Sequence, residues 1–328
     1  MTEIAVPAQV PNLLGKPILR DEVKPRSSLQ SVQFDPEKHL SYKDSPKTYT
    51  LEDFGIVSDR AISPVAVTEP FPLFSEETVQ IMRKELFTKE VWENCVVSTE
   101  FAHCQIRDYA AKYAPFTYDA WKHPKTLEII SKLAGVDLVT NLDLEISNIN
   151  VATQGFDDGE PKKEGDNDLP ATKWHYDSYP FVCVVMLSDT TNMVGGETAI
   201  KKPSGEVVRI RGPSSGNAVV MQGRCLNHQA LAAHGGVERI VAVTSFRPRD
   251  SMMMDTSVLT TIRPITDHSQ LYYEWAEYRT EVLQDRLRAM LKVLREQHRA
   301  GRKTDKVRLK KFLKEQEEWL ARTNEEIV

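Results

Sequence analysis

A strand-rich region between residues 174 and 248 constrains the fold of this chain more than any other feature. Three segments in it are apolar runs suited to buried strands: residues 181–187, 218–221 and 240–246. Gly195-Gly196 and Gly212-Pro213 mark turns between such segments. Many short strands without intervening helices are typical of a sandwich or barrel, so we expect a mainly β fold.

Helices are predicted on both sides of this region. One begins after Ser75, a good N-cap, and a second begins near Pro124 and stops at Gly135. At the C-terminus, apolar residues recur at helical spacing over residues 271–294, and a strongly charged helix runs to about residue 323. These amphipathic helices must bury their stripes against the chain's own barrel or a second subunit, so we expect a monomer or a homodimer.

Three further segments carry weaker signals. Residues 1–60 are rich in proline and predict an extended or partly disordered arm. Residues 142–151 predict a strand with Ile146, Asn148 and Asn150 on one side. Residues 155–170 are charged and rich in glycine and proline, which predicts a mobile loop. That loop is either a plain surface insertion or a lid over a site, and both readings remain open.

Composition excludes several classes of protein. The net charge of −5 argues against a nucleic-acid partner, because such proteins favour basic patches. No run approaches the ~20 apolar residues of a membrane helix, and the N-terminus does not resemble a secretory signal. The four cysteines form no CxxC pair. We therefore expect a cytoplasmic protein with reduced thiols and no membrane contact.

The motif His175-Tyr176-Asp177 is the strongest chemical signal. On a strand, His175 and Asp177 share a face, and Tyr176 points away from it. His228 from a later strand would complete two imidazoles and one carboxylate, a set that is diagnostic of non-haem Fe(II) oxygenases. A lone His-x-Asp is more often a packed or surface motif. The order of His228 and then Arg239 in the same strand-rich region favours a metal site.

Arg239 begins a predicted buried strand. If Gly235-Gly236 forms a two-residue hairpin turn, residue 228 lies opposite residue 243, and Arg239 then shares a face with His228. A guanidinium grips a carboxylate through two parallel hydrogen bonds, so an inward Arg239 predicts a carboxylate ligand. The alternative is a surface ion pair. Arg247 lies on the same face further along, and we expect it at the rim of the barrel.

Four segments resemble the core of Fe(II)- and 2-oxoglutarate-dependent dioxygenases, in the style of many fungal members. They are WHYDSYPFVCVVMLSD, GGETAI, GNAVVMQGRCLNHQAL and ERIVAVTSFRPRD, and the likeness covers roughly residues 140–250. The resemblance implies a double-stranded β-helix, a jelly-roll-like or cupin-like barrel, with Fe(II) on His175, Asp177 and His228. It implies that 2-oxoglutarate and O₂ are co-substrates, with Arg239 as the anchor of 2-oxoglutarate.

Two assignments depend on this likeness. His234 competes with His228 for the third ligand position, and we prefer His228 because the family places that ligand in the strand after QGR. Asn148 and Asn150 precede the loop, and we expect one of them, Asn150 in our assignment, to contact 2-oxoglutarate or substrate. A buried asparagine satisfied by the protein itself is the plain alternative.

The resemblance implies oxidation of a small molecule, such as an amino acid or a secondary-metabolite intermediate. The outcome would be hydroxylation, desaturation or ring formation. Halide-transferring members typically lack the carboxylate, so Asp177 argues against halogenation. We expect an arm over residues 1–60, a dioxygenase domain over residues 61–265 and a helical extension over residues 266–328.

Two other functions fit parts of the pattern. Zinc also accepts two histidines and one aspartate, so a zinc hydrolase is an alternative. Arg239 and the lack of a convincing general base beside the motif count against it. A non-catalytic barrel that binds a ligand is the other alternative, and the intact ligand set argues against it.

Overall fold

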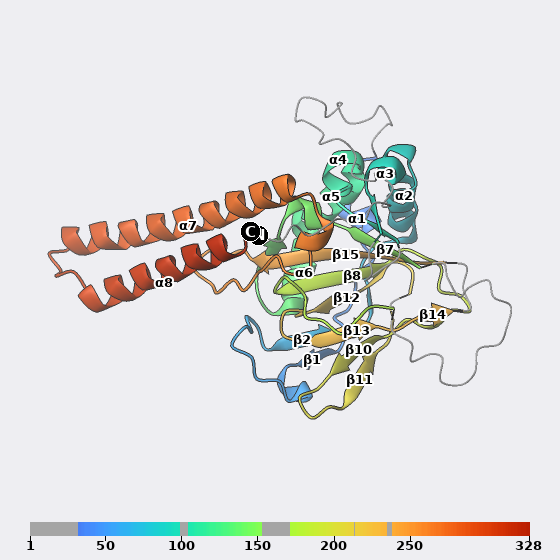
Figure 1. Cartoon of the computed structure of the whole chain (residues 1–328), viewed down its shortest axis with the longest axis horizontal. Helices are drawn as coiled ribbons and strands as arrows, with labels where there is room; N and C mark the ends of the chain where they lie inside the picture. The colour runs from blue at the N-terminus through green and yellow to red at the C-terminus, as the bar shows by residue number, and fades with distance from the viewer. Residues whose placement is uncertain (1–31, 99–103, 153–170, 213, 235–237) are drawn as a thin grey trace, which may run out of the picture.

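The structure is a computed structural model that describes residues 32–98, 104–152, 171–212, 214–234 and 238–328 (Figure 1). The predicted loop of residues 155–170 and most of the predicted N-terminal arm lie outside the described residues. The described part of that arm contributes helix α1 (Pro36–His39), strand β1 (Thr48–Thr50) and the 3-10 helix η2 (Glu52–Phe54).

The protein is rich in β-sheet, and over the described residues its largest sheet has ten strands. Along that sheet the strands follow one another in the order β1, β2 (Val65–Thr68), β12 (Asn217–Met221), β8 (Phe181–Met186), β15 (Arg239–Pro248), β7 (Asn148–Ala152), β5 (Cys104–Ile106) and β4 (Val96–Val97), with β3 (Phe71–Pro72) beside β12 and β6 (Leu138–Thr140) beside β15. A smaller sheet contains β11 (Val207–Ile210), β10 (Thr198–Lys201) and β13 (Asn227–Ala230), and β14 (Ala233–His234) pairs with β9 (Val194–Gly195). The strand-rich prediction is therefore confirmed.

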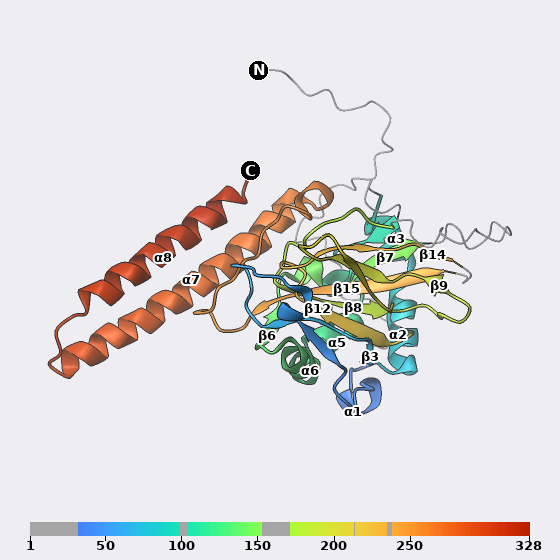
Figure 2. The same ribbon diagram turned by 90° about the horizontal axis from the view of Figure 1, so that it is seen from below.

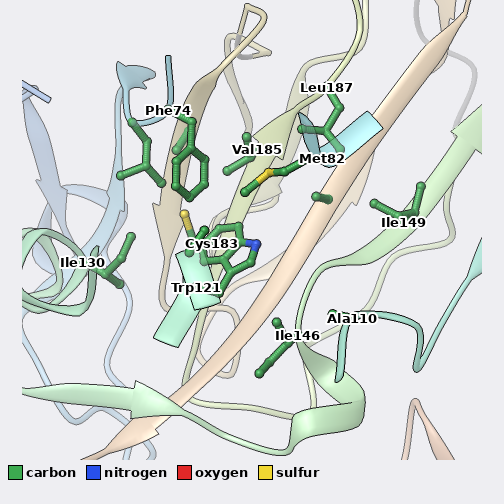
Figure 3. Close-up of a cluster of buried hydrophobic side chains, with 14 of the residues drawn as sticks. Phe74, Met82, Ala110, Trp121, Ile130, Ile146, Ile149, Cys183, Val185 and Leu187 are labelled. Carbon is green, nitrogen blue, oxygen red and sulfur yellow. The ribbon is translucent and has the colours of Figure 1, made fainter. Parts of the chain in front are cut away.

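The large sheet is covered on both faces, which explains why its central strands read as continuous apolar runs. From β8, Cys183 and Val185 pack towards the helices on one face (Figure 3). Val182 points the other way and shares an apolar cluster with Ile200 and Ile210 of the smaller sheet. The two sheets therefore face each other across a packed interior, with helices outside the larger one.

Helices cover the outer face of the large sheet. They are α2 (Glu76–Leu86), α3 (Lys89–Asn94), α4 (Ala110–Tyr113), α5 (Pro115–Lys122) and α6 (Pro124–Ala134). The predicted starts and stops are confirmed: Ser75 Oγ accepts from the backbone N of Thr78 at 3.3 Å, and Gly135 ends α6 at a φ of 67°. Trp121 of α5 is fully buried against this face (Figure 3).

The predicted hairpin register between residues 228 and 243 is wrong. His228 in β13 pairs with Ile200 of the smaller sheet, whereas Val243 in β15 pairs with Asn148 and Val184 of the larger sheet. The chain between them passes through β14, which pairs with β9, so His228 and Arg239 belong to different sheets. The Gly235-Gly236 turn itself lies outside the described residues.

The predicted strand over residues 142–151 is shorter than expected. Its first half forms the 3-10 helix η3 (Asp143–Glu145), and Ser147 follows with a φ of 59°. Ser147 donates its backbone N–H to Thr244 Oγ1 at 2.9 Å, a side-chain contact that sequence periodicity does not register. The strand β7 begins only at Asn148, and Ile146 lies before it.

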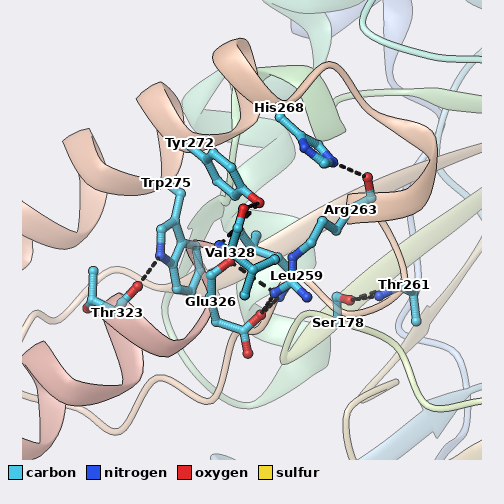
Figure 4. Close-up of polar contacts among 10 residues, drawn as sticks. All are labelled: Ser178, Leu259, Thr261, Arg263, His268, Tyr272, Trp275, Thr323, Glu326 and Val328. Atoms are coloured by element: carbon cyan, nitrogen blue, oxygen red, sulfur yellow. Dashed lines mark hydrogen bonds and ion pairs between the residues drawn. The ribbon is translucent and has the colours of Figure 1, made fainter. Parts of the chain in front are cut away.

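A long helical hairpin projects from the body (Figures 1 and 2). After the 3-10 helix η5 (Arg263–Ile265), it consists of α7 (His268–Arg299) and α8 (Lys306–Glu325). Polar contacts fix its base: Trp275 Nε1 donates to the backbone O of Thr323 at 3.1 Å, and Arg263 Nη2 pairs with Glu326 at 2.6 Å (Figure 4). Among the described helices, none is long and apolar enough to cross a membrane.

Candidate metal centre

The backbone brings the His-x-Asp segment beside β13. His175 and His228 form an antiparallel bridge in which each backbone N–H donates to the other's carbonyl O at 2.9 Å. Two residues on, the backbone N of Asp177 donates to the carbonyl O of Gly223 at 3.1 Å. His175 lies in an isolated bridge rather than in a regular strand, yet the bridge is enough to turn His175 and Asp177 to one centre.

The three side chains converge closely. Asp177 Oδ1 lies 3.5 Å from His175 Nε2 and 3.7 Å from His228 Nε2. The ligand-type atoms of all three lie within 4.8 Å of one another, and over the described residues this is the one group of His, Cys, Asp or Glu side chains with such spacing. We call His175, Asp177 and His228 the triad.

Hydrogen bonds fix the tautomer of each imidazole ring in its neutral form. His175 Nδ1 lies 2.8 Å from the carbonyl O of Lys173, and His228 Nδ1 lies 3.0 Å from that of Leu226. A carbonyl oxygen only accepts, so Nδ1 must carry the proton in each neutral ring. Both Nε2 lone pairs are then free and face Asp177. This is the way in which metal-binding histidines are usually held.

Burial and mutual charge set the pKa values of the triad. Burial acts to raise the pKa of Asp177, but His228 and His175 together hold it below its ordinary value, so the carboxylate is ionised. Burial lowers the pKa of His228, which keeps that ring neutral. Burial also acts to lower the pKa of His175, but Asp177 raises it above its ordinary value. The anionic carboxylate and neutral His228 are the forms that a divalent metal binds.

One carboxylate oxygen of the triad has no partner of its own. Asp177 Oδ2 is buried and makes no hydrogen bond within the described part of the chain. Such an orphaned anionic oxygen is costly unless a cation or donor compensates it. The donor set of two imidazole nitrogens and one carboxylate therefore fits Fe(II), with zinc as the chemical alternative.

Gly223 makes room for the Asp177 carboxylate. A Cβ placed on Gly223 would lie 1.7 Å from Asp177 Oδ2 and 2.5 Å from its Cγ. No side chain other than hydrogen fits there without moving the carboxylate. Sequence reasoning missed Gly223, because only the folded backbone brings it beside residue 177.

Arg239 lies at the start of β15 and lines a pocket with a volume of about 730 Å³. Its Nη2 donates to the carbonyl O of Gly196 at 3.5 Å, and its buried Nε has no partner among the described residues. Burial lowers its pKa to about 10, so it remains charged at neutral pH. Glu197 also lines this pocket, whereas the triad residues do not. Arg239 is thus a charged donor with unused hydrogen-bonding capacity.

The predicted competitors occupy other positions. His234 lies in β14, opposite Val194, while β13 and not β14 runs beside His175. The guanidinium of Arg247 stacks over the ring of Tyr278 at 4.9 Å. Tyr176, between His175 and Asp177, is 43% exposed.

A set of polar residues, which we call the polar wall, lies on β5 and β7 and in the segments next to the strands. We give this name to Gln105, Arg107, Glu145, Asn148, Asn150 and Tyr179. Gln105 donates to Asn150 Oδ1 at 2.7 Å, and Arg107 forms a buried ion pair with Glu145. Asn148 and Asn150 pair with Val243 and Val241 of β15, so they share their face. Of these residues, only the two asparagines were singled out from the sequence.

The polar wall holds unused hydrogen-bonding groups. Gln105 Oε1, Arg107 Nε, Asn148 Oδ1 and Tyr179 Oη are buried without a partner in the described parts of the chain. Burial raises the pKa of Tyr179 well above its ordinary value, so its hydroxyl stays protonated and can donate. Tyr179 lies two positions after Asp177, and this spacing was the signal in the sequence that could have found it.

No family model matches the chain, and no curated protein matches it. The structural matches include a 2OG-Fe(II) oxygenase family oxidoreductase from Burkholderia pseudomallei, with 12% identity over 46% of this chain and 71% of that one and a TM-score of 0.35. A Pseudomonas putida prolyl-4-hydroxylase has 15% identity over 53% of this chain and 88% of that one, with a TM-score of 0.36. A non-haem α-ketoglutarate-dependent carbocyclase from nogalamycin biosynthesis has 16% identity over 62% of this chain and 88% of that one, with a TM-score of 0.37. A likeness at this level does not assign an activity.

Proposed function

We propose that this chain is a non-haem Fe(II)- and 2-oxoglutarate-dependent oxygenase built on a double-stranded β-helix. The observation that carries the proposal is the triad. Its two Nε2 lone pairs and one carboxylate oxygen meet at a single point, and each imidazole is fixed by its Nδ1–H on a backbone carbonyl. Two histidines and a carboxylate on one side leave the other coordination positions open for ligands.

In the proposed complex, the His175 and His228 Nε2 atoms and the Asp177 carboxylate hold Fe(II). When bound, Fe(II) with 2-oxoglutarate and O₂ supplies oxidation of a C–H bond, and 2-oxoglutarate leaves as succinate and CO₂. The chain's own contribution is to orient the ligands and keep water away from the reacting centre. The buried position of His228, which is 6% exposed, supports this role.

Arg239 is the proposed anchor for the far carboxylate of 2-oxoglutarate. Its charge survives burial, and its Nε and Nη2 form the fork that matches a carboxylate. Asn150 remains our proposal for a second contact. Because its Oδ1 already accepts from Gln105, its amide N–H₂ is the group left for a ligand.

We propose that the polar wall orients the substrate, a small molecule such as an amino acid or a secondary-metabolite intermediate. The wall offers a donor in Tyr179 Oη and acceptors in Asn148 Oδ1 and Gln105 Oε1. Groups of both kinds suit a polar substrate that arrives between them. Hydroxylation, desaturation and ring formation are all compatible with this arrangement, and the intact Asp177 argues against halogenation.

The proposed oxygenase unit spans residues 61–265, and residues 266–328 form a helical extension. We propose that the protein works in the cytoplasm. This placement is supported by its four cysteines, which are free in the structure.

Conversion of 2-oxoglutarate to succinate tests the proposal. The purified chain with Fe(II) should form succinate, slowly without a prime substrate, and should not do so with Zn(II). His175→Ala, Asp177→Ala and His228→Ala should each abolish it and weaken metal binding, whereas His234→Ala should keep much of it. Arg239→Lys should bind the metal normally but need far more 2-oxoglutarate, because truncating such a buried contact costs about 2–5 kcal/mol. An active His228→Ala beside an inactive His234→Ala would show the ligand assignment to be wrong.

A further inference from the structure

The two helices of the hairpin present an apolar face that nothing in the described structure covers. Four of its leucines remain about half exposed: Leu287 (46%), Leu291 (44%), Leu313 (48%) and Leu320 (53%). Single exposed leucines are ordinary on a protein surface, but a contiguous set on one face indicates a binding surface.

The geometry of the helix pair places these leucines together. Leu287 directly follows the buried Arg286, Leu313 follows the buried Phe312, and Leu320 follows the buried Trp319. Each step along a helix turns by about 100° in the same sense, so each leucine lies about a quarter-turn beyond the contact between α7 and α8. The two helices run antiparallel and face each other. A quarter-turn in the winding direction of each helix therefore brings the exposed leucines of α7 and those of α8 to the same side of the hairpin.

Contacts between the helices fix this orientation. Arg279 of α7 stacks on the ring of Trp319 at 3.1 Å and donates to its carbonyl O at 3.2 Å. In return, Trp319 Nε1 donates to the carbonyl O of Arg279 at 3.0 Å. Neither helix can therefore rotate to bury its leucines against the other.

Charge divides the hairpin into two halves. The distal half, residues 286–314, holds twelve Lys and Arg residues against two acidic ones. The half next to the body, residues 268–285 and 315–328, holds nine Asp and Glu residues against two basic ones. The hairpin is thus a rod with a basic tip and an acidic base, and the apolar face runs along both halves.

We propose that this face binds the same face of a second copy of the chain, with the two hairpins antiparallel. A twofold axis across the middle of the rod then sets each basic tip beside the acidic base of its partner. A nucleic acid or an anionic membrane would match the tip alone, and the acidic base would repel it. The charge pattern and the apolar face are both satisfied by a second copy.

The size of the face suits a dimer. The 20 residues of α8 extend for about 30 Å, and two helices side by side are about 20 Å wide, which gives roughly 600 Å² on each partner. Standard interfaces bury about 800 Å² per partner, so this face alone supplies about three quarters of that area.

Sedimentation velocity of the full chain at micromolar concentration tests the proposal, and we expect twice the mass of one chain. Leu313→Glu should raise the dissociation constant about 100-fold or more, as loss of a central apolar contact does. Val307→Glu is the matched control: it adds the same charge to the same helix at a position that is 81% exposed and off the face, and it should remain dimeric. Leu320→Glu repeats the test if Leu313→Glu does not fold by circular dichroism.

Salt distinguishes the direction of pairing. An antiparallel dimer should weaken as salt rises, since opposite charges meet, whereas a parallel dimer would join two basic tips and strengthen. A monomeric wild-type chain, a dimer unchanged by Leu313→Glu and Leu320→Glu, or a dimer that salt strengthens would each overturn the proposal.

Discussion

Each histidine of the triad is held by a backbone carbonyl two residues before it, and this local arrangement decides its chemistry. With Nδ1 tied to Lys173 or Leu226, each neutral ring keeps its proton on Nδ1 and turns its Nε2 lone pair to the centre. Asp177 differs from the histidines, because no donor reaches its Oδ2 atom within the described residues. At the scale of single residues, the ligand-type atoms of the triad lie within 4.8 Å of one another, an arrangement that could hold a cation.

Gly223→Ala should disable the centre without touching a ligand. The new Cβ would displace the Asp177 carboxylate, so metal affinity should fall about 10–100-fold, as it does when groups that orient ligands are changed. Gly205→Ala is the control, because nothing lies within 4 Å of the added Cβ and only its positive φ is strained. Isothermal titration with Mn(II) measures both, and a Gly223→Ala chain that binds metal as tightly as the wild type contradicts the assigned role.

At the scale of elements, local sequence signals predicted the ends of helices correctly, whereas the predicted pairing of strands was wrong. Ser75 and Gly135 predicted helix ends because caps depend on neighbours a few residues away. The His228–Val243 register was wrong because pairing depends on β9 and β10, which lie elsewhere in the chain. The strand-rich prediction itself succeeded, since burial on both faces leaves a continuous apolar run.

The same distinction applies to the site. The i, i+2 spacing of His175 and Asp177 predicted that both face one centre. The choice of His228 over His234 as the third ligand depended on the family resemblance. The ion pair of Arg107 with Glu145 joins the residue after β5 to η3 across a long sequence separation, so no local pattern predicted it.

Glu274 on α7 should make stability depend on pH. Its carboxylate accepts from the backbone N of Leu144 at 3.1 Å, and burial raises its pKa from 4.5 to about 7. Between these two values the unfolded chain loses the proton that the folded chain keeps, so stability should fall as pH rises from about 4.5 to about 7. Glu274→Gln should remove that decline, because a glutamine side chain has no proton to lose in this range. Urea unfolding across this pH range measures the change, and a parallel pH dependence in both proteins would contradict it.

At the scale of the whole molecule, the base of the hairpin supports the site. Tyr179, two residues from Asp177, shares an apolar cluster with Trp275 and Tyr278 of α7 and with Trp319 of α8. The base of the helical extension is therefore packed against the segments next to the sheets, while its tip projects away from them (Figure 2). One apolar cluster thus links the hairpin to the segment that carries Asp177.

Truncation after residue 265 should therefore give insoluble or unstable protein. Loss of Trp275 alone, a fully buried side chain, should cost about 3–5 kcal/mol. Trp275→Ala measured by urea unfolding gives the graded version of the test, with the exposed Val307→Ala as control. A truncated chain that stays folded and fully active would show that the extension is dispensable.

A crystal structure of the chain grown without oxygen, with Fe(II) and 2-oxoglutarate, would locate both ligands. We expect iron on His175 Nε2, His228 Nε2 and Asp177, with the far carboxylate of 2-oxoglutarate on Arg239. Iron held by His234, or 2-oxoglutarate held by Arg247, would contradict it.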